Sequence, residues 1–368
     1  MLGSLGSVCR VSTLLLSILT SVSYAATVSL PSYPLAVKSP YLSTWVPGHQ
    51  LVNAATAQPE FWAGQDLNWT ILARVNNKAY SLFGAPKAIT GVTAASTKSV
   101  SYTSSHTYVT LMAGAVTFNL DFFSPVFPGT ADYARQSLPY SYLTVNATST
   151  SSVTVQILSA IDASWTAQNG ASALNFTTAG NVGYFQYHNS KEIPFTEVGD
   201  MATYGSVIFG STTGDKVAHG CGKASDLYAK FVNSGTLTAS PSCSNTDTAA
   251  LRRGLGTFTG AAPKNATFVV GFDRVQSINY LGKAQTGLYR SKWPTVQSAV
   301  QYVLSSYGSA LTSSLSFDSE VRSKAAAVSS SYGTQYADIV EASVRQTFGA
   351  IELTVGSPDY PLPVPRSD

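Results

Sequence analysis

The sequence predicts a mainly β protein, a β-sandwich followed by a short C-terminal α-helical segment. Apolar and polar residues alternate from about residue 68 to residue 274, which is typical of half-buried antiparallel strands. Many of the expected strands are short and are separated by Gly, Ser and Asn, which favours a sandwich. After residue 294 the apolar residues recur at spacings of three and four instead, as on one face of a helix.

The first 25 residues predict a secretory signal peptide. Arg10 is the only charged residue among the first 37, and an apolar run over residues 11–22 follows it. The small residues of Ser23-Tyr24-Ala25 fit the positions that a signal peptidase reads, so we expect cleavage before Ala26. The apolar run is too short and too rich in serine to span about 30 Å of hydrocarbon, which argues against a membrane anchor. We therefore expect a secreted, extracellular protein that does not contact the membrane after cleavage.

Several stretches carry clear strand patterns. The apolar residues of stretch 116–122 alternate with polar ones, and residues 153–157 repeat the alternation. Residues 69–75 and 79–83 flank Asn76-Asn77-Lys78 and predict a hairpin, because Asn tolerates the left-handed turn conformation. Residues 204–209 and 267–272 supply further strands.

Two helices are expected directly after the strands. Pro294 suits the first turn of a helix whose apolar positions run over residues 296–311. Asp318 is a good N-cap for a second helix, which ends before Gly333.

A third helix is expected at residues 335–353, and an irregular tail follows it. The charged residues of this helix are expected away from an apolar stripe formed by Tyr336, Val340, Val344, Phe348 and Ile351. Gly356 and four prolines within eight residues end regular structure. The expected organisation is a signal peptide at residues 1–25, a sandwich domain at 26–290, a helical segment at 291–355 and a tail at 356–368.

Charge and composition exclude one large class of partner. Without its first 25 residues the chain carries 21 Lys and Arg against 19 Asp and Glu, because only Arg10 is lost. This balance gives no electrostatic footprint for nucleic acid. We expect neither a cofactor nor a metal, and no partner protein is identifiable from the sequence. A small-molecule or glycan ligand stays open.

The cysteines predict one disulfide. Cys9 leaves with the signal peptide, so Cys221 and Cys243 remain and are expected to pair in an oxidising compartment. The alternative is a metal site, because His219-Gly220-Cys221 has the spacing of metal ligands. A closed zinc site usually needs four protein ligands, and the other histidines are far away in the sequence.

Four sequons predict surface positions that accept N-linked glycans in a secreted chain. Their asparagines are Asn68, Asn146, Asn175 and Asn265.

Several long blocks of the chain resemble the secreted glutaminase A family of fungi. The first runs from Ser32 to Gly84, begins SYPLAVKSPYLSTWVPG and contains Trp45, Trp62 and Trp69. Others are FFSPVFPGTADYARQSLPYSYLTV (122–145), VVGFDRVQSINYLG (269–282), YRSKWPTVQSAVQYVL (289–304) and YADIVEASVRQTFGAIELTV (336–355). The resemblance covers nearly the whole chain after the signal peptide.

The resemblance implies a fold and an activity. In this family a helical toroid of paired helices, of the six-hairpin type, follows the sandwich, and residues 336–355 match its opening helix. The family hydrolyses L-glutamine to L-glutamate and ammonia. The match ends near Val355, and SPDYPLPVPRSD does not look like the family's continuation. We therefore expect the N-terminal portion of a glutaminase A-like hydrolase that is inactive alone, because most of its helical catalytic domain is truncated.

The residues alone do not identify a catalytic group. Neither a G-x-S-x-G elbow nor a metalloprotease helix motif is present. Ser137 has no recognisable His and Asp partners. None of the acidic residues that could pair in the fold is favoured over a structural role; these are Asp121, Asp162, Glu197, Asp273 and Glu341.

Five residues are candidates for ligand binding. Tyr41, Trp45 and Trp62 lie in loop-like sequence and could line a ligand groove or stack on sugars, although packing at the edge of the sandwich core explains them as well. Arg135 and Arg345 could hold a substrate carboxylate with two hydrogen bonds. Salt bridges between the sandwich and the helices are the alternative for both arginines.

Two further functional hypotheses stay open. The chain could be a complete secreted enzyme, glutaminase or glycosidase, with its active site between sandwich and helices. It could instead be a secreted carbohydrate-binding or glycosidase-like sandwich, a binding module that holds polysaccharide or a partner with the sandwich face or with the loops around Trp45 and Trp62.

Overall fold

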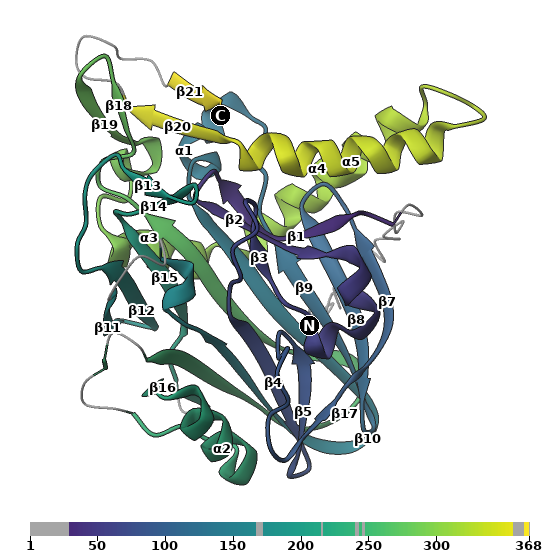
Figure 1. Ribbon diagram of the computed structural model, residues 1–368. Helices are drawn as coiled ribbons and strands as arrows, with labels where there is room; N and C mark the ends of the chain where they lie inside the picture. Colours follow the sequence, from purple (N-terminus) through teal and green to yellow (C-terminus); the bar gives the residue numbers. More distant parts are fainter. Residues whose placement is uncertain are drawn as a thin grey trace, which may run out of the picture.

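The computed structural model describes residues 29–166, 172–214, 216–239, 243–244, 247–355 and 364–367. The expected signal peptide therefore lies outside the described residues. The structure confirms a mainly β protein with a short C-terminal helical part (Figure 1). None of the helices in the described part of the chain combines the length and the apolarity needed to cross a lipid bilayer.

Two very long strands form the centre of the sandwich. β10 (Tyr140–Ile161) and β17 (Thr248–Asp273) pair in antiparallel fashion along their whole length. The other edge of β10 pairs first with β9 (Val116–Phe123) and then with β4 (Trp69–Val75). Register shifts between residues 147 and 156 interrupt the β10–β17 ladder, and such bulges bend a strand pair. Both strands therefore pass from one layer of the sandwich into the other.

The remaining strands extend these two layers. The order in the first layer is β7 (Ser96–Tyr102), β8 (His106–Ala113), β9, β10, β17, β15 (Ser206–Thr212), β12 (Val182–Asn189) and β11 (Ser172–Ala179). The order in the second layer is β6 (Val92–Ala94), β5 (Lys78–Phe83), β4, β10, β17 and β16 (Val217–Gly222). All of these neighbours are antiparallel except β5 and β6. The expected hairpin is confirmed, because Asn76 and Asn77 turn the chain between β4 and β5 with positive φ angles.

The main core lies between the two layers. Trp69 of β4 is fully buried, and its ring meets Phe122 of β9 edge-on at 5.3 Å and Trp165 at 5.4 Å. The alternation predicted for residues 116–122 is confirmed as far as Leu120. Asp121 breaks it, since this residue is buried too, on the face that the helices cover.

Helices cover the outer faces of both layers. α2 (Ala224–Ser234) places Leu227 and Phe231 against Leu72 and Leu158 of the second layer. α3 (Val296–Ser305) packs on the first layer, and a capping box between Thr295 and Ser298 fixes its start.

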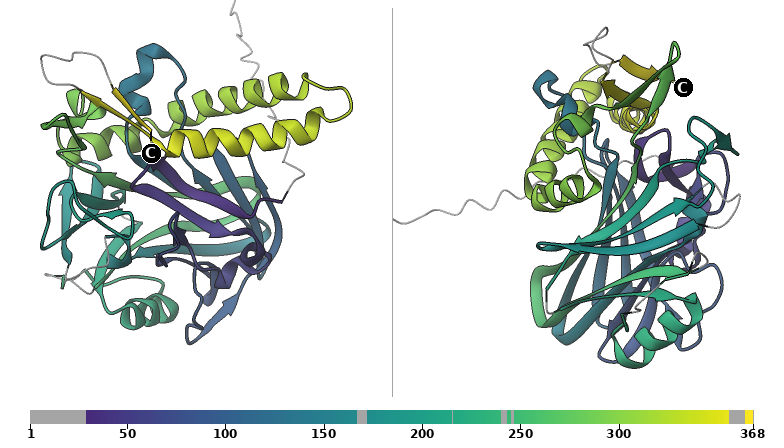
Figure 2. Two further views of the ribbon diagram at one scale, coloured as in Figure 1. Left: turned by 45° about the horizontal axis from the view of Figure 1, so that its top comes forward. Right: turned by 90° about the vertical axis from the view of Figure 1, so that its left-hand side faces the viewer.

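The last helices differ from the sequence prediction in their boundaries. α4 (Tyr307–Ala326) begins one residue after Ser306, so the predicted start at Asp318 is wrong. The Asp318 carboxylate accepts hydrogen bonds from side chains of the sandwich instead of capping a helix. α5 (Gly333–Gly349) lies antiparallel beside α4 and ends earlier than expected (Figure 2).

Strands replace the predicted end of the third helix and part of the predicted tail. β20 (Ile351–Val355) pairs with β21 (Val364–Ser367) in a small sheet. This sheet also contains β18 (Ile278–Tyr280) and β19 (Lys283–Gly287). Pro365 did not prevent this pairing, because an edge strand needs hydrogen bonds on one side only.

A three-stranded sheet lies between the sandwich and α5. It consists of β1 (Ser32–Ser39), β2 (Leu42–Pro47) and β3 (Glu60–Phe61). Gly349 of α5 approaches Val37 of β1 so closely that a Cβ atom would collide with its side chain. This contact holds the end of α5 against β1. The short elements not yet described are η1 (Gly48–Thr56), η2 (Thr130–Asp132), α1 (Tyr133–Gln136), η3 (Ala163–Trp165), β13 (Glu197–Val198), β14 (Met201–Ala202) and η4 (Leu288–Ser291).

Candidate functional site

Three of the five predicted ligand-binding residues line one pocket. Trp45 of β2, Trp62 after β3 and Arg345 of α5 are far apart in the sequence, yet all border a pocket of about 340 Å³. Glu60 and Gln346 border the same space. We call it the tryptophan pocket. It lies where the three-stranded sheet meets α5, which is the junction between the sandwich and the helical part.

The wall of the tryptophan pocket is aromatic and held in place. Trp45 donates a hydrogen bond from Nε1 to Ser43 Oγ at 2.9 Å. The backbone N–H of Trp62 donates to Ser43 O at 3.0 Å, and its ring remains 56% exposed. Burial raises the pKa of Glu60, and the neighbouring Asp66 adds to the increase. The pocket thus combines two indole rings with one carboxyl group.

Arg345 lies at the bottom of this pocket and is only 2% exposed. Its Nη2 has only long contacts, 3.5 Å to Pro34 O and 3.4 Å to Ser124 Oγ. Its Nε and Nη1 have no hydrogen-bond partner among the described residues. Burial lowers the pKa of Arg345 to about 10, so the guanidinium is still charged at neutral pH.

Acidic side chains surround Arg345 beneath the pocket. Asp318 of α4 accepts hydrogen bonds through Oδ2 from Thr103 at 2.6 Å and from Ser105 at 2.7 Å. Asp121 of β9 binds His106 Nδ1 at 2.7 Å. Both carboxylates favour the charged form of Arg345 electrostatically. We call Arg345, Asp318, Asp121 and His106 the buried charged cluster.

The buried charged cluster joins the sandwich to the helices. His106 and Asp121 belong to β8 and β9, whereas Asp318 and Arg345 belong to α4 and α5. His106 is stacked on Phe123 with ring centroids 4.3 Å apart, which fixes its orientation. Arg345 was predicted either to bind a ligand or to join the sandwich to the helices; it borders the tryptophan pocket and also contacts Pro34 and Ser124.

Lys38 is a buried charge that the sequence analysis missed. Its Nζ donates to Pro125 O at 2.8 Å and to Gln136 O at 2.9 Å. Burial and the nearby Arg345 lower the pKa of Lys38 to about 7. It lies in a strand with small and apolar neighbours, so no local pattern distinguished it from an exposed lysine.

A second charged group lies between α4 and α5. Arg322 Nη1 binds Asp338 Oδ1 at 2.9 Å and Glu341 Oε2 at 2.6 Å. Both acids are buried, although the helical pattern placed them away from the packed face. Two carboxylates share one guanidinium here, and burial raises the pKa of Glu341 to about 7.

We expect Glu341→Gln to change the pH dependence of stability. The folded protein keeps a proton on Glu341 that the unfolded chain releases above its ordinary pKa of 4.5. This contribution to stability is therefore complete below pH 4.5 and is lost as the pH rises through 7. The free energy of unfolding of the Gln variant, relative to that of the wild type, should therefore rise between pH 4.5 and 7. Above pH 7 this difference in stability should stay constant. Urea denaturation at pH 4.5, 6 and 8 measures it.

Glu320→Gln is the matched control for this experiment. Glu320 lies on the neighbouring helix α4, is exposed and pairs with Lys324 four residues away. Its replacement should leave the pH profile unchanged. Because Lys38 titrates in both proteins, its effect cancels in the comparison. A Glu341→Gln curve parallel to that of the wild type would show that folding does not raise the pKa of Glu341.

The other two predicted ligand-binding residues lie outside the tryptophan pocket. The Tyr41 ring lies under the Arg274 guanidinium, 4.1 Å from its Cζ, and the Tyr41 hydroxyl binds Glu197. Arg135 pairs with Asp132 three residues earlier and covers the ring of Phe127. Packing contacts account for both positions.

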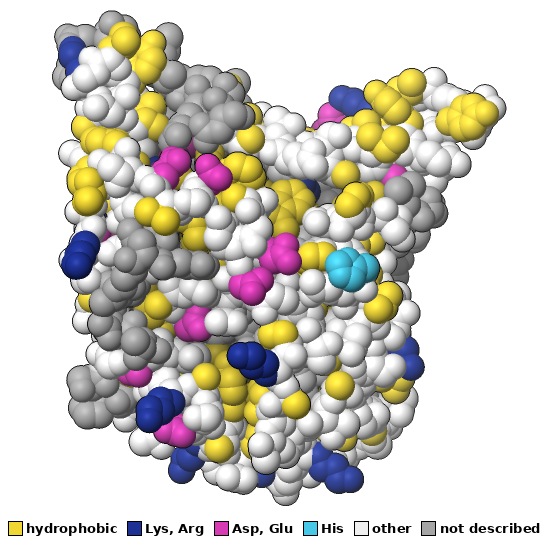
Figure 3. Space-filling view, viewed as in Figure 1, with side chains coloured by type: hydrophobic (Ala, Val, Ile, Leu, Met, Phe, Trp, Pro, Cys, Tyr) yellow, Lys and Arg dark blue, Asp and Glu magenta, His cyan; other side chains and the backbone are white. Residues whose placement is uncertain are grey.

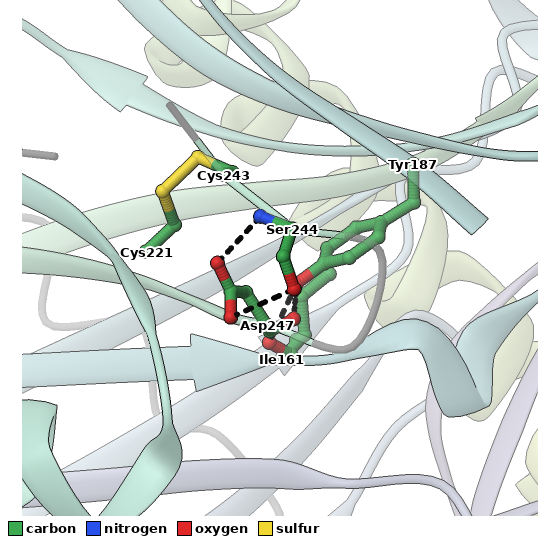
Figure 4. Close-up of a disulfide and its surroundings, with 6 residues drawn as sticks. All are labelled: Ile161, Tyr187, Cys221, Cys243, Ser244 and Asp247. Atoms are coloured by element: carbon green, nitrogen blue, oxygen red, sulfur yellow. Dashed lines mark hydrogen bonds between the residues drawn. A yellow bond between two sulfur atoms is a disulfide. The ribbon is translucent and has the colours of Figure 1, made fainter. Parts of the chain in front are cut away.

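The expected disulfide is present. Cys221 and Cys243 are bonded, with their Cα atoms 5.6 Å apart (Figure 4). The bond ties the segment after α2 to β16, next to the turn in which Asp247 accepts a hydrogen bond from Ser244 N. The structure does not support a metal site at His219 and Cys221. The sulfur of Cys221 is bonded to Cys243, and the His219 ring stacks on Phe176.

The sequons lie at or near the surface. Asn68, Asn175 and Asn265 are exposed, and Asn146 is half-buried in β10. Asn68 also borders a larger groove of about 890 Å³ between α2 and the loop after β5. None of the predicted ligand-binding residues borders this groove.

The far end of the α4–α5 hairpin exposes apolar side chains. The most exposed are Val328, Tyr332, Tyr336 and Ile339. Figure 3 shows hydrophobic side chains gathered on this projecting end. The expectation that the stripe beginning at Tyr336 stays partly exposed is confirmed, since none of its residues is buried.

Comparisons with known proteins agree with the architecture. A family model described as a domain of unknown function, DUF5127, matches residues 105–324. Glutaminase A of Aspergillus oryzae is 30% identical over 373 residues, which cover 94% of this chain and 52% of that protein. A protein of Arthroderma benhamiae named "Probable glutaminase/05536" is 27% identical over 226 residues, covering 55% of this chain and 25% of that protein. The chain thus spans about half or less of the length of these curated relatives.

Proposed function

Because the chain belongs to the glutaminase A family, we propose that it supplies the sandwich and the first helices of a secreted glutaminase-type hydrolase. The reaction of that enzyme is the hydrolysis of L-glutamine to L-glutamate and ammonia. The similarity to a glutaminase that runs through nearly the whole chain, strands and helices alike, is the observation that carries this proposal. The signal-like N-terminus and the surface sequons support secretion and N-glycosylation.

We further propose that these 368 residues do not hydrolyse glutamine by themselves. Amide hydrolysis needs an activated nucleophile or water together with a group that stabilises the oxyanion. Of the residues that line the tryptophan pocket, Glu60 is the only carboxylate. Asp121 and Asp318 are buried beneath it, and each is already held by hydrogen bonds from the sandwich. The exposed apolar end of the α4–α5 hairpin fits a helical layer that packs against further helices.

An ammonia-release assay tests both parts of the proposal. The chain is expressed with its own N-terminus in a fungal host and purified from the medium, where the mature protein should begin at Ala26. With millimolar L-glutamine we expect no ammonia above a heat-inactivated blank, because the catalytic groups are not assembled. Glutaminase A of Aspergillus oryzae serves as the positive control.

Steady glutamine turnover by the monodisperse chain would contradict the proposed inactivity and would place the active site in this half of the enzyme. If the chain remains inactive, the secretion proposal still depends on the N-terminus of the protein in the medium. Met1 at the N-terminus of the protein in the medium would contradict cleavage before Ala26, and retention of the whole chain inside the cell would contradict secretion.

A further inference from the structure

The tryptophan pocket has the chemistry of a sugar-binding site. Trp62 is 56% exposed and is the only tryptophan among the large apolar side chains that are exposed in the described residues. Exposed aromatic rings beside a pocket provide a flat apolar surface, which the C–H face of a pyranose ring can cover. Trp45 adds a second indole ring on the same pocket.

Polar groups stand beside these rings at positions where sugar hydroxyls would reach them. Glu60 can accept hydrogen bonds, and the Gln346 amide can both donate and accept them. Such a combination of apolar surface with a few placed polar groups is typical of small-ligand sites. The volume of about 340 Å³ lies at the lower end of the range for such sites and suits a short saccharide.

The backbone that carries Trp62 is held in place before any ligand arrives. The chain reverses direction directly after β3, where Phe61 N donates to Gln65 O and Gly64 N donates to Phe61 O, both at 2.8 Å. Trp62 N is bonded to Ser43 O of β2. A platform fixed by backbone hydrogen bonds loses little conformational entropy on binding, which favours affinity.

The charges around the pocket select a neutral ligand. Arg345 is the only cationic side chain in the lining, and its Nε and Nη1 are sealed from solvent beneath the surface. The Asp318 and Asp121 carboxylates already balance its charge. The accessible charge in the pocket is the Glu60 carboxylate, which repels an acidic sugar.

We propose that the tryptophan pocket binds a neutral saccharide, with a sugar ring stacked on Trp62 and Trp45 and its hydroxyls bonded to Glu60 and Gln346. This role is separate from glutamine hydrolysis, because it needs no catalytic group. It would attach the protein to neutral glycans outside the cell.

Titration calorimetry with a defined set of saccharides tests the proposal. The probes are laminarihexaose, cellohexaose, chitohexaose and mannohexaose, with the acidic oligogalacturonate of the same length as the comparison. The full chain is first treated with an endoglycosidase so that its own N-glycans do not compete. We expect at least one neutral hexasaccharide to bind and oligogalacturonate to bind more weakly.

Three variants locate the binding site. Trp62→Ala should weaken binding tenfold or more, and Glu60→Gln should weaken it several-fold while preserving the shape of the pocket. Tyr332→Ala is the control, because it removes an aromatic ring that is even more exposed than Trp62, at the far end of the α4–α5 hairpin. Since Trp62 is largely exposed, its removal should leave the melting temperature within a few degrees of the wild type.

Three results would overturn the proposal: no binding of any neutral probe, a preference for oligogalacturonate, or saccharide binding that Trp62→Ala does not weaken. None of them bears on ammonia release, so failure of this inference is distinguishable from failure of the glutaminase proposal.

Discussion

Arg345→Ala is expected to destabilise the protein by about 3–5 kcal/mol, the range found when one partner of a buried charge group is removed. Without the guanidinium, the buried Asp121 would keep only His106 as its partner, and Asp318 would lose one of the groups that favour its charged form. The truncated side chain would also leave a cavity beneath the tryptophan pocket. The free energy of unfolding from urea titrations at pH 7 measures the loss.

Two further variants separate the effect of the lost charge on stability from the effect of the lost side-chain volume. Arg345→Met keeps most of the side-chain volume and should still destabilise strongly, because Asp318 and Asp121 both lose the positive charge of the guanidinium. Adding Asp318→Asn to it should recover a large part of the loss, since a buried charge pair replaced by neutral groups is often nearly neutral in stability.

Arg135→Ala is the matched control for the arginine series. Arg135 forms a half-exposed pair with Asp132, and such pairs contribute about 0–1 kcal/mol. Equal losses for Arg135→Ala and Arg345→Ala would show that the buried charged cluster is not what joins the helices to the sandwich.

Removing the disulfide should give the second large effect. The double variant Cys221→Ser/Cys243→Ser opens a loop between residues 22 positions apart, for which the chain-entropy model gives about 3 kcal/mol. Both cysteines are replaced together so that no free thiol remains in the buried position of Cys221. Urea denaturation again measures the change.

Reduction of the wild type before denaturation is the control, and it should produce a similar loss. Thiol labelling of the denatured but unreduced wild type gives an independent check. Two labelled thiols per chain would mean that the bond does not form in the purified protein.

The sequence patterns predicted the sandwich better than the helices. Period-two alternation depends on one buried face, and β9 follows it until Asp121, where the outer face is buried as well. The apolar stripe that begins at Tyr336 does not mark the packed face of α5. That face instead contains Asp338, Glu341 and Arg345. A hydrophobic pattern cannot anticipate a charged face, because the groups that neutralise it come from other parts of the chain.

The position of Asp318 shows the same limit. An aspartate before an apolar run is a reasonable N-cap in the sequence. In the structure its carboxylate accepts hydrogen bonds from Thr103 and Ser105, which lie more than 200 residues away in the chain. Likewise, Trp45 and Arg345 were separate candidates with no stated relation, and only the packing of α5 on β1 brings them to one pocket.

The long central strands determine when this protein can fold. β10 cannot complete its pairing until β17 has been synthesised. β17 follows α2 and the disulfide-bonded loop in the chain, so it leaves the ribosome after them. Contacts of such high sequence separation close slowly, so a high contact order is expected to make folding slow. Until residue 273 has been synthesised, one edge of β10 has no partner, and an unpaired strand edge invites association between nascent chains. This edge therefore needs protection while the chain is being synthesised, and slow folding is expected to reduce the yield of the protein as much as low final stability would.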